Sequence, residues 1–291
     1  DALPIFEGSE KLKQVIVQKR FSSRKLPHLL TLVNETDEKV LYIFKEDDDI
    51  SMDVAVMELL TLANEVWESR KCPAHLQTYN VVSTPNNTGF CECIDGETML
   101  VSDNDTMLKQ LGRDPEQWEK FYYSMIGVIV ATAAFDITDR HDNNALFSPH
   151  GDIALIDLSA SLGQKAPMDL VLMMNPIYFP VRFKQLHRDY RRLSGDEPIS
   201  KKLGWKFWDE VEEDAMVSYY SLYNNYSLRN VLKVCHYSMP PPINFLKKLN
   251  ERKHKNAQRK EKLRNGIVQN MEDSDKVSKF VSTVCHILPG N

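Results

Sequence analysis

The chain has 291 residues and 42% of them are hydrophobic, which is enough to bury the core of one large domain or of two lobes. Its 36 basic and 41 acidic side chains give a formal net charge of −5, and this balance argues against a general nucleic-acid-binding protein. The five cysteines are odd in number and scattered, so a secreted disulfide scaffold is not expected and the cytoplasm is the expected compartment. The longest uncharged apolar stretch, Phe121–Phe135, is too short to span a bilayer.

The first third of the chain is predicted to form a small sheet with one helix. Four β-rich runs bounded by turn residues predict two hairpins, His28–Val33 with Val40–Lys45 and Asn80–Thr84 with Phe90–Ile94. Between the hairpins, Ser51–Arg70 has apolar residues at the i, i+3, i+4, i+7 spacing of an amphipathic helix. Cys91 and Cys93 alternate along their strand, so we expect both to face the same side as packing residues.

The remainder of the chain is predicted to be mainly helical. Asp114-Pro115 is a strong helix start, with aspartate as the N-cap and proline at the first helical position. Because Phe121–Phe135 carries no charge on any face, this helix should be buried. Further helices are expected around Phe183–Leu193, Phe207–Tyr223 and Ile243–Leu263.

A hairpin with a polar pair at its open end is predicted between the helix that begins at Asp114 and the helix expected around Phe183–Leu193. Two short apolar runs flank the turn residues 148–152. If the turn is centred between His150 and Gly151, Asn144 lies opposite Asp157, with Cβ atoms roughly 5 Å apart. Amide and carboxylate oxygens are hard ligands, suited to a Mg²⁺ ion that also binds water and nucleotide phosphates. The sequence therefore predicts a magnesium site at this position.

The residues around this pair resemble a known family. Asp139-Arg140-His141-x-x-Asn144, followed thirteen residues later by Asp157, is similar to the catalytic and metal-binding loops of the phosphoinositide 3-/4-kinase superfamily. The similarity extends in the same order from about Phe21 to Gly163. It implies an α+β, two-lobed protein-kinase-like fold, with a small β-rich N-lobe at residues 1–94 and a larger, mainly helical C-lobe at residues 95–291. ATP and Mg²⁺ would bind between the lobes.

The resemblance assigns nucleotide-binding roles to upstream residues. Lys45 and Asp53 lie in a segment similar to the family's I-x-F-K-x-x-D-D-L-R-Q-D, in which the lysine contacts the phosphates and the last aspartate lines the pocket. Ser51 and Met52 depart from that pattern. Ser22 and Ser23 match the family's phosphate-covering loop.

Two further segments complete the implied pocket. Tyr79 corresponds to the pocket tyrosine that pairs with the aspartate at position 53. The backbone at Glu92 and Ile94 matches the inter-lobe connection that would hold the adenine edge.

The reaction chemistry implied by the resemblance centres on the catalytic loop. Asp139 could orient or deprotonate the attacking hydroxyl, and His141 is a second candidate acid or base, a choice that the sequence leaves open. Arg140 is expected to brace the loop. Where relatives have D-F-G, this chain has Asp157-Leu158-Ser159, which keeps the metal-binding aspartate, packs leucine in place of phenylalanine and loses the backbone freedom of glycine.

The phosphate acceptor is left open between two classes. The segment Leu158–Pro180 corresponds to the family's activation segment and has Lys165 as its one cation, so it disfavours a highly phosphorylated lipid. The resemblance implies a phosphatidylinositol-type lipid as the acceptor, with a serine/threonine protein as the alternative and a nucleotide-binding pseudokinase scaffold as the alternative of another class. Basic clusters in residues 182–192 and 245–264 are read either as contacts to an anionic membrane surface or as solvated helix faces.

Overall fold

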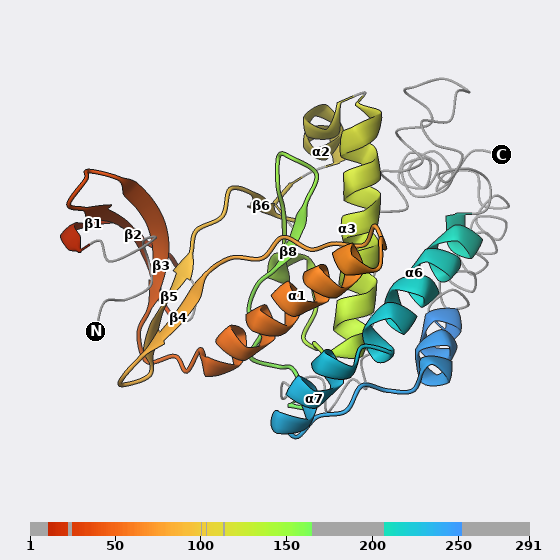
Figure 1. Ribbon diagram of the computed structural model, residues 1–291. Helices are drawn as coiled ribbons and strands as arrows, with labels where there is room; N and C mark the ends of the chain where they lie inside the picture. Colours follow the sequence, from red (N-terminus) through yellow and green to blue (C-terminus); the bar gives the residue numbers. More distant parts are fainter. Residues whose placement is uncertain are drawn as a thin grey trace, which may run out of the picture.

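The computed structural model describes residues 11–22, 25–99, 101–102, 104–112, 114–164 and 207–251 (Figure 1). Over these ranges the protein is a mixed α/β structure with two antiparallel sheets, one of five strands in the order β1-β2-β3-β5-β4 and one of three in the order β6-β7-β8. The strands of the larger sheet are β1 Leu12–Arg20, β2 His28–Asn34, β3 Lys39–Lys45, β4 Val81–Thr84 and β5 Thr88–Glu92.

Both predicted hairpins of the larger sheet are confirmed, as β2–β3 and β4–β5. The second has a tighter turn than expected, because Asn86 and Asn87 take positive φ values of 65° and 54° and complete the reversal early. Thr88 and Gly89 therefore belong to β5, and Ile94 lies beyond the strand. Strand β1 was not predicted; it pairs only with β2 within the described sheet, and its lysines and exposed residues are typical of an edge strand.

The predicted amphipathic helix is α1, Ser51–Ser69, and its apolar side packs into the core. Val56, Leu60 and Ala63 are fully buried. The equally buried Trp67 donates its indole N–H to the carbonyl of Ser218, 3.1 Å away on α6 (Phe207–Tyr223). This bond connects α1, which lies between β3 and β4 in the chain, to the helical part of the molecule.

Helix α3, Pro115–Ala134, is the central element of the helical part (Figure 1). As predicted, Asp114 caps it by accepting a hydrogen bond from the Glu116 N–H at 2.9 Å. Every residue from Phe121 to Ala134 is buried, because neighbouring elements cover the helix on all sides. A short helix that was not predicted, α2 Asn104–Leu111, lies beside one end of α3 (Figure 1). Within the described ranges, no helix is long and apolar enough to cross a membrane.

The smaller sheet consists of β6 Glu97–Thr98, β7 Ala145–Phe147 and β8 Ile153–Leu155, with a 3₁₀ turn, η1 Asp142–Asn144, just before β7. The predicted β7–β8 hairpin is confirmed, but the predicted register was wrong by one residue. Ala145 pairs with Leu155, so the residue opposite Asn144 is Ile156 rather than Asp157. The difference arises from the turn.

The turn of this hairpin has three residues in its loop. Ser148 donates its N–H to the Asp152 carbonyl at 2.9 Å, which leaves Pro149, His150 and Gly151 between the paired residues. Gly151 has a φ of 86°, the left-handed conformation that closes a loop of this length. A turn with an odd number of residues shifts the centre of the hairpin onto His150, and the partner of Asn144 shifts with it.

The last described elements agree in part with the sequence predictions. Helix α6 has the predicted bounds, and residues 242–251 are helical where Ile243–Leu263 was predicted to begin. Helix α7, Tyr226–Val234, was not predicted; its N-cap is Asn225, which accepts from the Leu228 N–H at 2.9 Å. The predicted helix Phe183–Leu193, the basic segment 182–192 and most of the basic segment 245–264 lie outside the described residues.

An ionic cluster connects the turn of the β7–β8 hairpin to α3 and to the segment that carries His75. The Asp152 carboxylate lies 2.6 Å from the Lys120 ammonium on α3 and 3.1 Å from the His75 imidazole. Partial burial favours protonation of Asp152, but the hydrogen bonds from His75 and Lys120 outweigh it, and the pKa of Asp152 is lowered. Asp152 therefore stabilises the folded protein while it is ionised.

Replacing Asp152 with Asn should lower the free energy of unfolding at pH 7 by about 1–2 kcal/mol, because charge-assisted hydrogen bonds to a half-buried carboxylate are lost. Since the folded pKa is lowered, the contribution is complete above the ordinary value of 3.8 and is lost as the pH falls through the folded value. Urea unfolding at several pH values should show the difference from wild type shrinking in acid. Asp37→Asn, which removes an exposed pair with Lys13, is the control and should have a smaller effect.

Candidate active site

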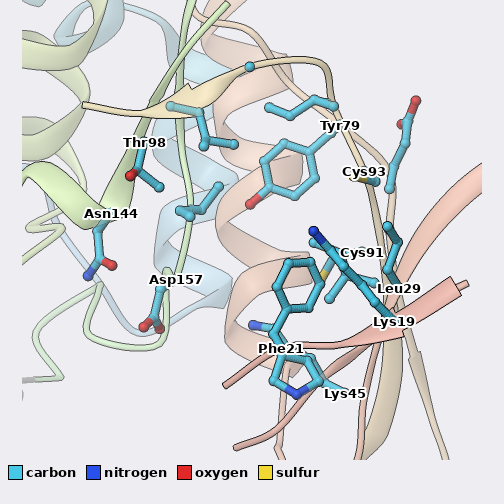
Figure 2. A pocket seen from close by; sticks show the side chains of 17 residues that line it. Lys19, Phe21, Leu29, Lys45, Tyr79, Cys91, Cys93, Thr98, Asn144 and Asp157 are labelled. Atoms are coloured by element: carbon cyan, nitrogen blue, oxygen red, sulfur yellow. The ribbon is translucent and has the colours of Figure 1, made fainter. Parts of the chain in front are cut away.

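A cavity of about 570 Å³ lies between the larger and the smaller sheet (Figure 2). One wall comes from β1, β2, β3 and β5, and the other from β6, η1, β7 and the residues after β8. Apolar side chains line most of it, and a few charged and polar groups complete the lining, which is the usual composition of a small-molecule site. The lining residues are Lys19, Phe21, Pro27, Leu29, Ile43, Lys45, Tyr79, Cys91, Glu92, Cys93, Ile94, Gly96, Thr98, Asn144, Leu146, Ile156 and Asp157.

Strand alternation explains which side chains of the larger sheet reach the cavity. Ile43 and Lys45 are two residues apart on β3, and Ile43 pairs directly with Cys91 on β5. Cys91 and Cys93 face the same side, as predicted, but both line the cavity instead of serving only as packing residues. Burial raises the pKa of the Cys91 thiol to about 11, so this thiol stays protonated near neutral pH.

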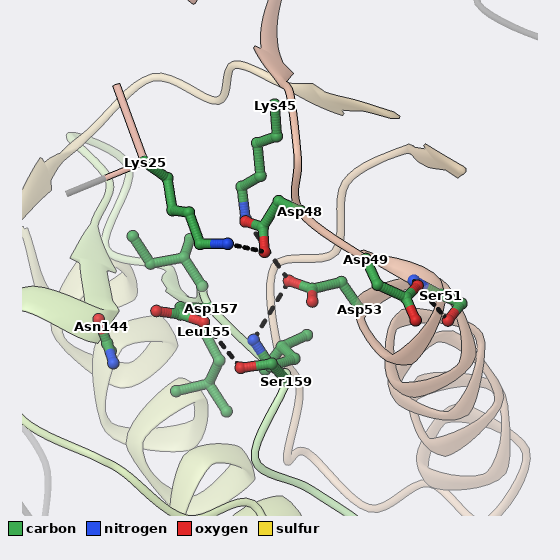
Figure 3. A network of polar contacts seen from close by, with 12 residues as sticks. Lys25, Lys45, Asp48, Asp49, Ser51, Asp53, Asn144, Leu155, Asp157 and Ser159 are labelled. Carbon is green, nitrogen blue, oxygen red and sulfur yellow. Dashed lines mark hydrogen bonds and ion pairs between the residues drawn. The ribbon is translucent and has the colours of Figure 1, made fainter. Parts of the chain in front are cut away.

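Lys45 lies at the centre of a polar network at one end of the cavity (Figure 3). Its ammonium is 4.0 Å from a carboxylate oxygen of Asp53 on α1 and 4.0 Å from one of Asp48 in the loop between β3 and α1. Asp53 is buried and accepts a hydrogen bond from the Leu158 N–H at 3.2 Å. The network thus connects strand β3, helix α1 and the segment that follows β8.

The carboxylates around Lys45 keep it charged. Burial disfavours the ammonium form, but the nearby carboxylates of Asp53, Asp157 and Asp48 outweigh burial, and the pKa of Lys45 is raised. For Asp53, burial is the dominant effect and raises its pKa in spite of the lysine. A charged lysine on a strand beside a cavity is suited to binding an anionic ligand such as a phosphate.

Asn144 and Asp157 lie next to each other on the wall opposite Lys45 (Figure 2). The amide nitrogen of Asn144 donates to the Asp139 carbonyl at 3.0 Å, so the amide oxygen points away from that carbonyl. Asp157 has a φ of 56°, a left-handed conformation that aspartate tolerates better than most residues. This turn in the backbone brings the Asp157 carboxylate to the cavity although Asp157 does not pair with Asn144 in the hairpin.

The donor set of this pair fits a magnesium ion. It offers one amide oxygen and one exposed carboxylate, both hard ligands. Among the described residues there is no group of three or more His, Cys, Asp or Glu side chains that could form an all-protein metal cage. Mg²⁺ usually binds to one or two carboxylates and takes its remaining ligands from water and phosphates, so a site of this kind needs only a small number of protein ligands.

Arg140 joins the loop that carries Asn144 to the segment that carries Asp157. Its guanidinium group donates to four backbone carbonyls, of Thr138 at 2.8 Å, Asn144 at 3.1 Å, Ile156 at 2.8 Å and Asp157. The first two carbonyls belong to the loop before β7, and the other two follow β8. The prediction that Arg140 braces the loop is confirmed.

The two candidate acid–base residues lie beside the cavity and not in its lining. Asp139 is partly buried, with a φ of 53°, and its carbonyl is the acceptor for the Asn144 amide. His141 is exposed and precedes η1 on extended backbone. Because both residues stand in the loop that carries Asn144, both stay candidates, and the choice between them stays open.

The predicted nucleotide-binding residues have mixed outcomes. Lys45, Tyr79, Glu92 and Ile94 line the cavity, whereas Asp53 lies behind Lys45. Tyr79 does not hydrogen-bond Asp53 as expected. Instead its hydroxyl donates to the Leu155 carbonyl at 3.2 Å, because strand β8 passes directly beside it.

The predicted phosphate-covering loop, residues 21–27, is described only in part. Ser22 is exposed and is not among the lining residues, and Ser23 lies outside the described residues. The same loop contributes Lys25, whose ammonium donates to the Asp47 carbonyl at 2.8 Å and lies 3.7 Å from the Asp48 carboxylate.

Two lining residues from β1 and the loop after it were not predicted as site residues. The Lys19 ammonium lies 4.7 Å from the centre of the Phe21 ring, a cation–π contact on the wall opposite Asn144. Their spacing of two residues along an extended segment places both side chains on the same face. Recognising β1 as a strand would have placed Lys19 in the larger sheet.

The segment after Asp157 accommodates its unusual sequence. Leu158 is fully buried in the core, as expected for a residue in place of phenylalanine. Ser159 is not among the residues with positive φ, so it carries no strain of the kind that glycine relieves. Its hydroxyl donates to a carboxylate oxygen of Asp157 at 3.2 Å. The serine therefore orients the carboxylate that the magnesium prediction depends on.

Comparison with known proteins reveals distant relatives, among them several phosphatidylinositol 3-kinases. Over 163 residues, 49% of this chain, it is 25% identical to the phosphatidylinositol 3-kinase C2 domain-containing subunit gamma of Rattus norvegicus. It is 28% identical over 181 residues to phosphatidylinositol 3-kinase 3 of Dictyostelium discoideum, and 26% over 161 residues to phosphatidylinositol 3-kinase pik3 of Schizosaccharomyces pombe. The matches cover 11%, 11% and 20% of those proteins. No protein-family model matches the chain.

The role of Arg140 can be tested by Arg140→Lys. Lysine keeps the charge but lacks the rigid fork of donors, so several carbonyls lose their partner and the free energy of unfolding should fall by about 1–3 kcal/mol. Urea denaturation would measure it. Arg229→Lys, on the exposed surface of α7, is the matched control and should stay close to wild type. Equal stability of the two variants would contradict the bracing role.

Proposed function

We propose that this protein is an ATP- and Mg²⁺-dependent phosphotransferase that moves the γ-phosphate to a hydroxyl group, and that its acceptor is a phosphatidylinositol-type lipid. The observation that carries the proposal is the placement of Lys45 and the Asn144–Asp157 pair on facing walls of one cavity. A cation on one side and two hard metal ligands on the other are what a triphosphate with its magnesium ion requires. The lipid acceptor is supported by the names of the distant relatives, which are phosphatidylinositol 3-kinases.

The proposal implies a two-lobed, protein-kinase-like arrangement with the nucleotide between the lobes. The larger sheet with α1 would be the N-lobe, and the smaller sheet with the helical part would be the C-lobe, with the boundary near residue 94. The adenine edge would bind at the backbone of Glu92 and Ile94, where β5 ends and the chain crosses to β6. Among the described residues, no hydrogen bond occupies the N–H of Ile94, which leaves this donor available to a ligand.

The proposed chemistry assigns a task to each polar group. Lys45 binds the phosphates, and Asn144 with Asp157 would hold Mg²⁺, which neutralises phosphate charge when bound. Arg140 and Ser159 position those ligands through the hydrogen bonds described above. Asp139 or His141 would orient or deprotonate the acceptor hydroxyl.

Two alternatives differ in acceptor and in class. A serine/threonine protein is the alternative acceptor, since the segment Leu158–Pro180 has a single cation with which to grip a phosphorylated headgroup. A nucleotide-binding pseudokinase scaffold is the alternative of another class, motivated by the Asp157-Leu158-Ser159 sequence. The orientation of Ser159 toward the Asp157 carboxylate favours turnover over that scaffold.

Asp157→Asn should reduce Mg²⁺-dependent phosphate transfer by about 100-fold or more, because the one carboxylate of the metal pair is removed. Asparagine tolerates the φ of 56° at this position, so the fold should persist. Transfer from labelled ATP and thermal unfolding would be measured together. Asp37→Asn is the matched control, since Asp37 also has a positive φ, of 65°, but lies in the β2–β3 turn away from the cavity.

The acceptor class can be determined with labelled ATP and Mg²⁺ in two parallel incubations, one with vesicles containing phosphatidylinositol and one with a mixed protein extract. The proposal predicts label in the lipid, and none in the protein pool above that seen with Asp157→Asn. Label confined to protein would favour the protein-kinase alternative. Intact ATP binding without label in either pool would favour the scaffold.

A further inference from the structure

The Asp48 carboxylate contacts two lysines, Lys25 and Lys45, beside the end of the cavity that Lys45 lines (Figure 3). One oxygen of Asp48 is 3.7 Å from the Lys25 ammonium, and the other is 4.0 Å from the Lys45 ammonium. The two lysines come from different elements, the phosphate-covering loop and the end of β3. Asp48 thus contacts both cations at the end of the cavity where the proposed function requires a nucleotide's phosphates.

The backbone around Asp48 holds this carboxylate in place. The Asp48 N–H donates to the Asn87 carbonyl at 2.7 Å, which anchors the loop to the β4–β5 turn. The preceding residue, Asp47, has a φ of 53°, and its carbonyl accepts the hydrogen bond from Lys25. The Asp48 side chain is 28% exposed, so it is neither buried beyond reach nor free in solvent. These contacts direct the carboxylate toward the lysines.

The charges at this end of the cavity do not favour a bare polyanion. The ammonium groups of Lys25 and Lys45 face three carboxylates, those of Asp48, Asp53 and Asp157. A metal-free triphosphate must displace Asp48 from both lysines and approach Asp157 without a cation between them. A triphosphate that carries Mg²⁺ brings the cation that Asp157 and Asn144 would bind, and this compensates the repulsion.

We propose that Asp48 is a specificity-determining residue that pairs with Lys45 and Lys25 in the absence of nucleotide and thereby makes the site select metal-loaded over metal-free nucleotide. This inference rests on the proposed function, because it requires the cavity to bind a nucleoside triphosphate. Asp48 competes with the phosphates for the lysines. The Mg²⁺ ion carried by the nucleotide compensates the repulsion and lets the phosphates displace Asp48.

The test is nucleotide affinity with and without metal. Asp48→Asn keeps the shape of the side chain but removes the competing charge, so ATP should bind about three- to tenfold more tightly in the presence of a chelator, the range expected for partly exposed ion pairs. Affinity for Mg²⁺-ATP should change less, so the ratio of the Mg²⁺-ATP affinity to the metal-free ATP affinity should fall. Binding is followed by calorimetry at constant low ionic strength, since salt screens such pairs.

Three further variants make the result specific. Asp47→Asn makes the same charge change one residue away, at a position where asparagine tolerates the φ of 53°, and should leave the ratio at the wild-type value. Asp48→Glu keeps the charge and should keep metal-free binding weak. Asp48→Ser removes the same carboxylate with a different side chain and should reproduce the Asp48→Asn result.

Several results would overturn the inference. Metal-free binding that is unchanged or weaker in both Asp48→Asn and Asp48→Ser, with both proteins folded by thermal unfolding, would show that Asp48 supports the site instead of competing for it. If Asp47→Asn gains as much affinity for metal-free ATP, the effect comes from the overall charge of this loop and not from Asp48. If wild type binds ATP in neither condition, the proposed function itself fails, and the inference fails with it.

Discussion

The hydrogen bonds of the Arg140 guanidinium are the constraint on which the rest of the site depends. They join the carbonyls of Thr138 and Asn144 to those of Ile156 and Asp157, and so connect the loop before β7 to the segment after β8. Buried carbonyls need a partner, and a planar fork with five donors can satisfy several at once. With these loops joined, the Asn144 amide and the Asp157 carboxylate meet at one end of a cavity.

The cavity itself results from how the two sheets are supported. Helix α3 is buried along its apolar length and fixes the β7–β8 hairpin, whose turn is held by Asp152 and whose backbone bonds to Ser124 at 2.8 Å. Helix α1 fixes the larger sheet and delivers Asp53 behind Lys45. Charged groups therefore face each other across a space whose walls are mostly apolar. In such surroundings, charge–charge interactions are stronger than in water, which explains why Lys45 stays protonated and why the placement of each carboxylate matters.

Local sequence signals predicted many of the elements but not their exact pairing. The Asp114 cap of α3 and the periodicity of α1 are short-range properties, and the structure has α1, α3 and α6 where they were expected. The β7–β8 register depended on one further fact, the positive φ of Gly151, which the sequence permits but does not require. Edge strand β1 was missed because exposed residues on both faces give it no alternating pattern. Lys19 was missed with it.

From the sequence alone came the order of chemical groups along the chain: a strand-end lysine, the D-R-H-x-x-N loop and an aspartate after a second short strand. The covalent chain fixes this order, and local propensity placed most of these groups on the correct helix, strand or loop. Only the tertiary structure decided which groups meet. It paired Tyr79 with the Leu155 carbonyl instead of Asp53, brought Asp48 between Lys25 and Lys45, and turned Asp157 into the cavity from outside the hairpin pairing. Such contacts join residues up to about a hundred positions apart, so they depend on the packing of the whole core, which no local pattern encodes.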